Sequence, residues 1–185
     1  MARKNFGAKP WLYPQPVLIV GTYDAQGNPD AMNAAWGGMY DSNQVMLCLG
    51  SHRTTDNIKL KGAFTVSFAT AGTVVASDYV GIVSANDDPE KMKKSGFTAV
   101  KGEFVDAPLF EELPLAIECK LLKFNEDGIV VGEIVSVCAD ERILTPDGKI
   151  DAKKLDAIVL DPANGEYLRL GEKVGNAFHD GMQLK

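Results

Sequence analysis

The sequence has few of the residues that bind metals or form disulfides. Its three cysteines, Cys48, Cys119 and Cys138, are widely separated, and each lies among apolar residues. An odd number of scattered cysteines favours buried thiols in a reducing compartment over a disulfide framework. The two histidines, His52 and His179, lie far apart, so no cluster has the spacing of a zinc site. We therefore expect core cysteines, no metal site and a cytoplasmic protein.

Long apolar runs and runs of basic residues are also missing. The longest apolar segments, such as Val17–Val20 and Ile129–Val131, are far too short to cross a bilayer. The basic residues near the N-terminus are not followed by the apolar stretch of a secretory signal. The formal net charge is -6, and the lysines and arginines form no basic stripe of the kind that binds nucleic-acid phosphates. We expect a protein that handles small molecules, with neither nucleic acid nor a membrane among its partners.

The sequence contains no recognisable hydrolase motif. Ser51 and His52 are neighbours, but no G-x-S-x-G elbow or Walker A loop accompanies them. The segment Trp36-Gly37-Gly38 lacks the rest of a G-x-G-x-x-G fingerprint and opens no βαβ unit, which argues against a Rossmann site. We therefore name no catalytic side chain. A bound cofactor that carries out the chemistry would explain the shortage.

Most of the chain has the pattern of short β-strands. Apolar or alternating segments predict strands at residues 16–23, 31–36, 44–49, 64–68, 115–124, 129–138, 157–160 and 167–170. The strand at 64–68 alternates and is expected to be half-buried, and the Asp-Gly step at 127–128 predicts a hairpin. Closely spaced strands without βαβ alternation favour an antiparallel barrel or sandwich, in a single domain over residues 1–185.

Helical signals are fewer and shorter. Thr54 or Thr55 is expected to cap a helix that ends at Lys61. Asp88 is expected to cap a second helix that runs to Lys94, with proline at its first position. Both helices are followed by a glycine, which is typical of helix ends.

The segment SHRTTDNI, residues 51–58, lies where a strand is expected to end and a helix to begin. Free N–H groups at a helix start, with hydroxyls and the guanidinium of Arg53 nearby, form a site suited to an anion. In the alternative interpretation, Thr54 or Thr55 only caps the helix and Arg53 is solvated. The segment taken alone is consistent with both.

A second distinctive segment, residues 31–40, places Asn33 and Trp36 among small residues. Small side chains on a strand let a flat ligand approach the backbone closely. The alternative is tight sheet packing with Trp36 as a core residue. A third segment, residues 78–91, has the pattern of a loop between two short helices with solvated charges.

Four segments in this order resemble the flavin reductase-like, FMN-binding split-barrel family, particularly its flavoredoxin-type members. They are NAAW at 33–36, SHRTTDNI at 51–58, DYVGIVSANDDPEKMKKSGF at 78–97 and EYLRLGEKVGNAFHDG at 166–181. The resemblance covers the chain from about Pro10 onward. It implies a mainly β fold, a Greek-key split β-barrel with a few short helices, and a homodimer with FMN near the dimer interface. The family's Ser-Gly after "GIV" is Ser84-Ala85 here, a departure from the pattern.

The resemblance also implies which residues bind FMN. Four would line the isoalloxazine ring, partly through backbone groups: Asn33, Ala34, Ala35 and Trp36. Three would continue this wall towards the ribityl chain: Leu49, Gly50 and Ser51. The phosphate would be held by Ser51, Arg53 and Thr54, with Asn57 supporting that turn and Lys91 near the flavin.

The expected function is an FMN-dependent oxidoreductase that passes electrons through its flavin, with NADH or NADPH as the donor. The alternative is a flavoredoxin-type electron carrier that exchanges electrons with a redox partner protein and has no small substrate of its own. A third alternative is a flavin-binding or purely structural barrel without redox turnover. The three differ in whether reduced nicotinamide, a protein or no donor at all reduces the flavin.

Overall fold

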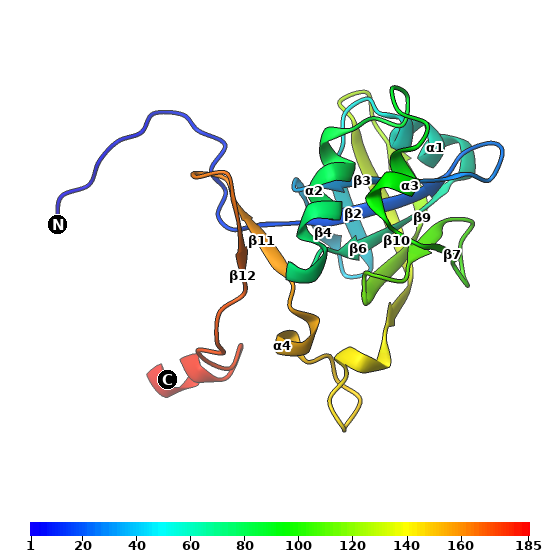
Figure 1. Ribbon diagram of the computed structural model, residues 1–185. Helices are drawn as coiled ribbons and strands as arrows, with labels where there is room; N and C mark the ends of the chain where they lie inside the picture. Colours follow the sequence, from blue (N-terminus) through cyan, green and yellow to red (C-terminus); the bar gives the residue numbers. More distant parts are fainter.

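The computed structural model describes residues 1–185 and is centred on a seven-stranded antiparallel sheet that curls into a half-barrel (Figure 1). In spatial order, its strands are β3 (Pro29–Ala34), β2 (Leu18–Tyr23), β6 (Ala63–Phe68), β9 (Leu115–Phe124), β10 (Ile129–Ala139), β5 (Gln44–Cys48) and β4 (Gly37–Asp41). The edge strands β3 and β4 are separated in the chain only by Ala35 and Trp36. The sheet therefore has to curl until its two edges meet at this corner.

Two smaller sheets lie beside the barrel. One contains β1 (Gln15–Pro16), β11 (Ile158–Asp161) and β12 (Glu166–Arg169), and the other pairs β7 (Ala99–Lys101) with β8 (Pro108–Phe110). Pairing of β1 with β11 joins the N-terminal arm to the C-terminal hairpin. In Figure 1 this sheet stands to one side of the barrel, and the two chain ends extend beyond it.

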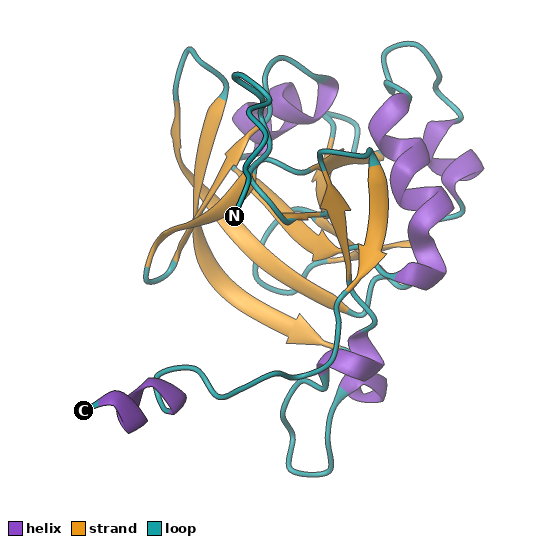
Figure 2. Cartoon of the chain, turned by 90° about the vertical axis from the view of Figure 1, so that its left-hand side faces the viewer, coloured by secondary structure: helices purple, strands orange, loops and turns teal.

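Short helices cover parts of the sheet (Figure 2). They are α1 (Arg53–Lys61), α2 (Val74–Ile82), α3 (Lys91–Ser95) and α4 (Ala152–Leu155), with 3-10 turns η1 (Ala71–Thr73), η2 (Glu141–Ile143) and η3 (Asp180–Leu184). Helix α1 inserts the fully buried Ile58 into the barrel core, and α2 packs against the outer face of β3. None of the helices is both long enough and apolar enough to span a bilayer.

The apolar core has two parts, divided by strand β2. Leu18 and Val20 face the barrel interior, whereas Val17 and Ile19 pack with Val80 of α2 on the outside. Alternation along a strand sends successive side chains to opposite faces. A strand that is buried on both faces reads as the continuous apolar run VLIV seen in the sequence.

The expected strands are present, and the hairpin at Asp127-Gly128 is confirmed by the pairing of β9 with β10. The expectation of a half-buried strand at 64–68 was wrong. Strand β6 lies between β2 and β9, so Val66 faces the barrel core while Thr65 and Ser67 are buried on the other face. The sequence pattern did not reveal β1, β4, β7 and β8, which are short or rich in glycine and charged residues.

The cysteines differ in their surroundings. Cys119 is fully buried in the barrel core, and burial, with a smaller effect of Glu118, raises the pKa of its thiol to about 12. Cys48 and Cys138 are only partly buried, so the expectation of three core thiols was wrong for these two. Cys48 is the last residue of β5, and Cys138 is the next to last of β10.

Candidate functional site

Helix α1 begins directly after the loop that follows β5. Its N-cap is His52, not Thr54 or Thr55 as expected. The backbone N–H of His52 donates to Thr55 Oγ1 (2.9 Å), and the same hydroxyl donates to the His52 carbonyl (2.7 Å). Thr55 therefore fixes the helix start from within the first turn. The predicted end is confirmed, because α1 ends at Lys61 and Gly62 follows with φ = 64°.

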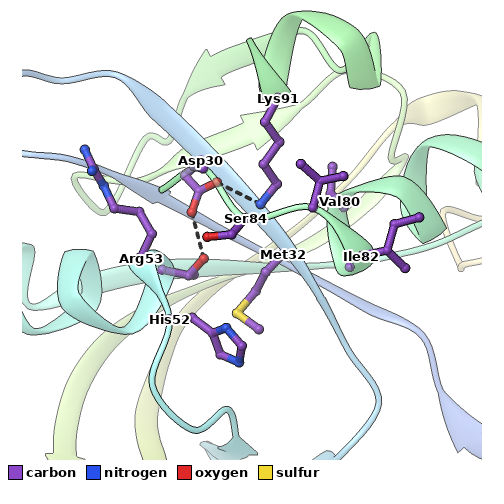
Figure 3. Close-up of a pocket in the computed structure, with 12 residues that line it drawn as sticks. Asp30, Met32, His52, Arg53, Val80, Ile82, Ser84 and Lys91 are labelled. Atoms are coloured by element: carbon purple, nitrogen blue, oxygen red, sulfur yellow. Dashed lines mark hydrogen bonds and ion pairs between the residues drawn. The ribbon is translucent and has the colours of Figure 1, made fainter. Parts of the chain in front are cut away.

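The expected cap of the other helix was also placed too early. Helix α3 begins at Lys91, with Glu90 as its N-cap. Asp88 instead accepts a hydrogen bond from the backbone N–H of Glu90 (3.0 Å) and ties the turn before the helix. Lys91 is therefore the first residue of the helix, and its buried side chain points into the protein (Figure 3).

Three buried polar side chains meet beneath the start of α1. Asp30 on β3 accepts a hydrogen bond from Thr54 Oγ1 (2.8 Å) and pairs with Lys91 Nζ (3.1 Å), as Figure 3 shows. All three residues are at most 3% exposed. A charge at such depth requires a partner of opposite sign. This cluster joins β3, α1 and α3 at one point.

Asp30 is not among the site residues predicted from the sequence. A signal was available, because alternation along β3 places Asp30 on the same face as Met32 and Ala34. A carboxylate on a core-facing position implies a buried cation or hydroxyl partner. The partner itself, Lys91, is 61 residues away in the chain and could not be inferred from the local pattern.

Arg53 is neither free nor fully solvated. Its Nη2 lies 3.0 Å from Asp24 Oδ2, and its side chain is 39% exposed. Burial alone would raise the pKa of Asp24, but hydrogen bonds from Asn28, Gln26 and Arg53 together lower it. One face of the guanidinium is thus held in place, and its other N–H groups remain available to a ligand.

The remaining residues of the predicted phosphate site divide into two groups. Asn57 is buried and donates from Nδ2 to Thr22 Oγ1 (3.1 Å), which fixes α1 against β2. Ser51 is exposed in the loop before the helix. Thus Ser51, the free N–H groups of Arg53 and the first backbone N–H groups of α1 can contact an anion. Thr54, Asn57 and Lys91 hold protein partners and shape the site.

A cavity of about 170 Å³ lies between this helix start, β3 and the end of α2. Its walls include six polar or charged side chains: Asp30, His52, Arg53, Thr54, Ser84 and Lys91. Figure 3 shows Val80 and Ile82 of α2 on the apolar side and Met32 close to His52. The structure therefore brings Arg53, Thr54 and Lys91 together around one hollow, as expected for neighbouring parts of a single site.

The four residues of the predicted ring wall point in different directions. Asn33 faces α2, where its Nδ2 donates to the Ser77 carbonyl (2.9 Å) and Gly81 packs against its Cβ. Ala34 is buried in the barrel core. Trp36 is 54% exposed, so the interpretation of this residue as core filling was wrong.

Ala35 and Trp36 border an open groove of about 690 Å³ between the N-terminal arm and the corner of the barrel. Cys48 lies on this groove and His52 on the smaller cavity, so the loop between these residues lies between the two hollows. Within that loop Leu49 is buried in the core, and Gly50 is exposed. The loop rests on the β9–β10 hairpin, where Leu49 N donates to the Gly128 carbonyl (3.0 Å).

Comparison with known proteins identifies this arrangement. The profile described as "Flavin reductase like domain" matches residues 11–151. The chain belongs to the flavin reductase-like family. The mainly β split-barrel fold inferred from the sequence is thereby confirmed, and flavin reductase-like split-barrel proteins of lower identity share it.

Two solved structures extend the similarity over nearly the whole chain. Flavoredoxin of Desulfovibrio vulgaris (Miyazaki F) is 38% identical with a TM-score of 0.93, and the match covers 97% of this chain and 100% of that one. Flavoredoxin from Methanosarcina acetivorans is 30% identical with a TM-score of 0.87, and all of both chains is covered. This flavin reductase-like chain thus has the fold of flavoredoxins.

A curated relative is more distant. An uncharacterized protein of Aeropyrum pernix is 28% identical over 132 residues, which make up 68% of this chain and 50% of that protein. The chain therefore spans about half the length of this relative.

Proposed function

We propose that this flavin reductase-like chain binds FMN and transfers electrons through it as an oxidoreductase, with NADH or NADPH as the donor. The observation that carries the proposal is the pair of hollows on either side of the loop between Cys48 and His52. One presents Arg53 and the start of α1, and the other is bordered by the exposed Trp36. A phosphate suits the first, and a flat, amphipathic ring suits the second.

The donors at the helix start fit a phosphate dianion. Ser51 offers a hydroxyl, Arg53 offers guanidinium N–H groups not used by Asp24, and α1 offers backbone N–H groups. Thr54 and Lys91 keep this start in position through Asp30, and Asn57 does so through Thr22. The protein thus contributes binding and alignment.

The groove beside Trp36 fits the flavin ring, because it offers backbone groups and open space. The Asn33 amide is engaged with α2, so polar contacts to the ring come from backbone groups of residues 33–36 and 49–51. At Gly38 an added Cβ would meet nothing within 4 Å, so this part of the wall is open. Bound FMN supplies the redox chemistry, accepting electrons from the donor and passing them to an acceptor. The protein has to hold the donor in line with the flavin ring so that electrons can pass between them.

We further propose that the protein works as a homodimer. Trp36, Met39 and Tyr40 are 54%, 62% and 52% exposed at the corner and on the edge strand β4. Exposed apolar groups at a sheet edge favour contact with another chain. Sedimentation equilibrium on the purified protein tests this, and a mass of one chain at all concentrations would contradict it.

The similarity to two flavoredoxins supports a second candidate, an electron carrier between protein partners. The visible spectrum of the purified protein, recorded anaerobically before and after NADH or NADPH is added, separates the candidates. Rapid bleaching of bound flavin supports the reductase. Flavin that is reduced only by a partner protein supports the carrier, and a protein that binds no FMN contradicts both.

A further inference from the structure

The C-terminal tail, residues 174–185, is locally folded but leaves its apolar side chains exposed. Val174, Phe178 and Leu184 are 101%, 104% and 89% exposed. The tail nevertheless has its own structure, because Asp180 accepts a hydrogen bond from the backbone N–H of Asn176 (2.8 Å) and starts η3. Figures 1 and 2 both show this tail projecting away from the barrel.

The backbone at Phe178 has a conformation that is uncommon for a bulky residue. Its φ of 61° lies in the left-handed region, which is unfavourable for a bulky side chain. Such conformations persist where surrounding contacts hold them. Local hydrogen bonds hold this backbone, from Asn176 N to Asp180 Oδ2 and from Asp180 N to the Asn176 carbonyl. They present the Phe178 ring wholly exposed, with no partner in its own chain.

The groove beside Trp36 has the properties that such a tail requires. It is about 690 Å³ in volume and is bordered by Trp11, Trp36 and Met46. Lys9 is the only charged residue among those that line it. The tail is similarly poor in charge, with Asp180 and Lys185 of opposite sign. Aromatic and aliphatic side chains on both sides make the two surfaces complementary in chemistry.

We propose that the tail of one copy packs in this groove of a second copy, with Phe178 as the anchor, and closes the ring side of the flavin site. A groove and a tail on every chain give two equal contacts related by a two-fold axis. The proposal rests on the proposed FMN site and homodimer. It adds that each site is completed by a named segment of the partner subunit.

Tryptophan fluorescence provides a direct test, because both tryptophans of the chain line the groove. In flavin-free protein, the double variant Val174→Asp/Phe178→Asp should shift the emission to longer wavelength and lose protection against acrylamide quenching. A matched control is Val75→Asp/Val137→Asp, which alters two residues that are 79% and 58% exposed elsewhere. The control should leave the emission unchanged. Equal emission from the tail variant and the unmodified protein would overturn the proposal.

FMN binding by mixed copies tests whether the tail acts across the dimer. The tail variant alone should bind FMN at least about tenfold more weakly, the loss expected when an aromatic anchor leaves an interface. Mixing it with an Arg53→Ala copy, which has a normal tail, should restore one tight site per mixed dimer. No restoration would mean that the tail acts on its own chain or not at all. Failure of the unmodified protein to bind FMN would instead contradict the proposed function.

Discussion

Lys91 Nζ lies 3.1 Å from Asp30 Oδ1, and the two side chains are only 4% and 5% exposed. The same carboxylate receives the hydroxyl of Thr54 from the start of α1. A single buried acid therefore positions both the helix that would face the phosphate and the lysine that is expected near the flavin.

Removing one member of this pair should destabilise the protein strongly. We expect Lys91→Met to cost about 3–5 kcal/mol of unfolding free energy, because it leaves the Asp30 carboxylate buried without its cation. Urea unfolding measures the loss. The double variant Asp30→Asn/Lys91→Met should recover much of it, since no uncompensated charge remains. Losses that simply add in the double variant would contradict the pairing.

Arg53→Ala should weaken FMN binding by about 1.5–3 kcal/mol, the usual range for a hydrogen bond to a charged group. Titration of the apoprotein with FMN measures the change. Riboflavin, which lacks the phosphate, should bind the variant and the unmodified protein alike. Arg142→Ala is a matched control, because Arg142 also pairs with an aspartate but is exposed away from the cavity. An equal loss for riboflavin would place the phosphate elsewhere.

Trp36→Ala should weaken FMN binding while changing the stability of the fold only slightly. Truncation of a core tryptophan costs about 3–5 kcal/mol of stability. Trp36 is half exposed, so we expect a change in unfolding free energy well below that range, together with a clear loss of FMN affinity. A large loss of unfolding free energy in urea would contradict this prediction and would support the interpretation of Trp36 as a core residue.

Gly128→Ala should disturb the loop that lies between the two hollows. An added Cβ at Gly128 would lie 2.7 Å from Gly50 N and Cα, and φ is 80°. Gly148→Ala is the matched control, because its φ is 78° but an added Cβ meets nothing within 4 Å. Both variants should lose about 1–2 kcal/mol of stability from the left-handed backbone. Gly128→Ala should lose more, because its Cβ would also overlap the backbone of Gly50. Only Gly128→Ala should also weaken FMN binding, and equal affinities for the two variants would contradict this role.

Alkaline pH should loosen the C-terminal hairpin from α2. Tyr167 donates to Asp78 Oδ1 (2.8 Å), and burial, followed by this hydrogen bond, raises the pKa of Tyr167 from 10.0 to about 12. A raised pKa favours the neutral phenol in the folded state. Its contribution to stability is therefore complete below pH 10 and is lost as the pH rises towards 12.

Thermal unfolding of Tyr167→Phe measures this contribution. The variant should melt below the unmodified protein at pH 8, and the difference should shrink above pH 10. Tyr40→Phe, which changes an exposed tyrosine, should track the unmodified protein at every pH. A gap for Tyr167→Phe that is constant from pH 8 to 12 would contradict the assignment.

The sequence alone determined the features that depend on neighbouring residues. Apolar runs and alternation located the principal strands, Asp127-Gly128 located the hairpin, and Gly62 marked the end of α1. These signals act within a few residues, because strand period, turn geometry and helix termination are local properties of the backbone. The order of the four family segments also indicated the split barrel.

Only the tertiary structure decided which side chains are free to meet a ligand. Arg53 is paired with Asp24 at a separation of 29 residues, and Asn33 is bonded to Ser77 at a separation of 44. The partners of Lys91 and the exposure of Trp36 likewise follow from the curl of the sheet and the packing of α1 and α2 on it. Such contacts join residues far apart in the chain, so their geometry exists only once the barrel has closed.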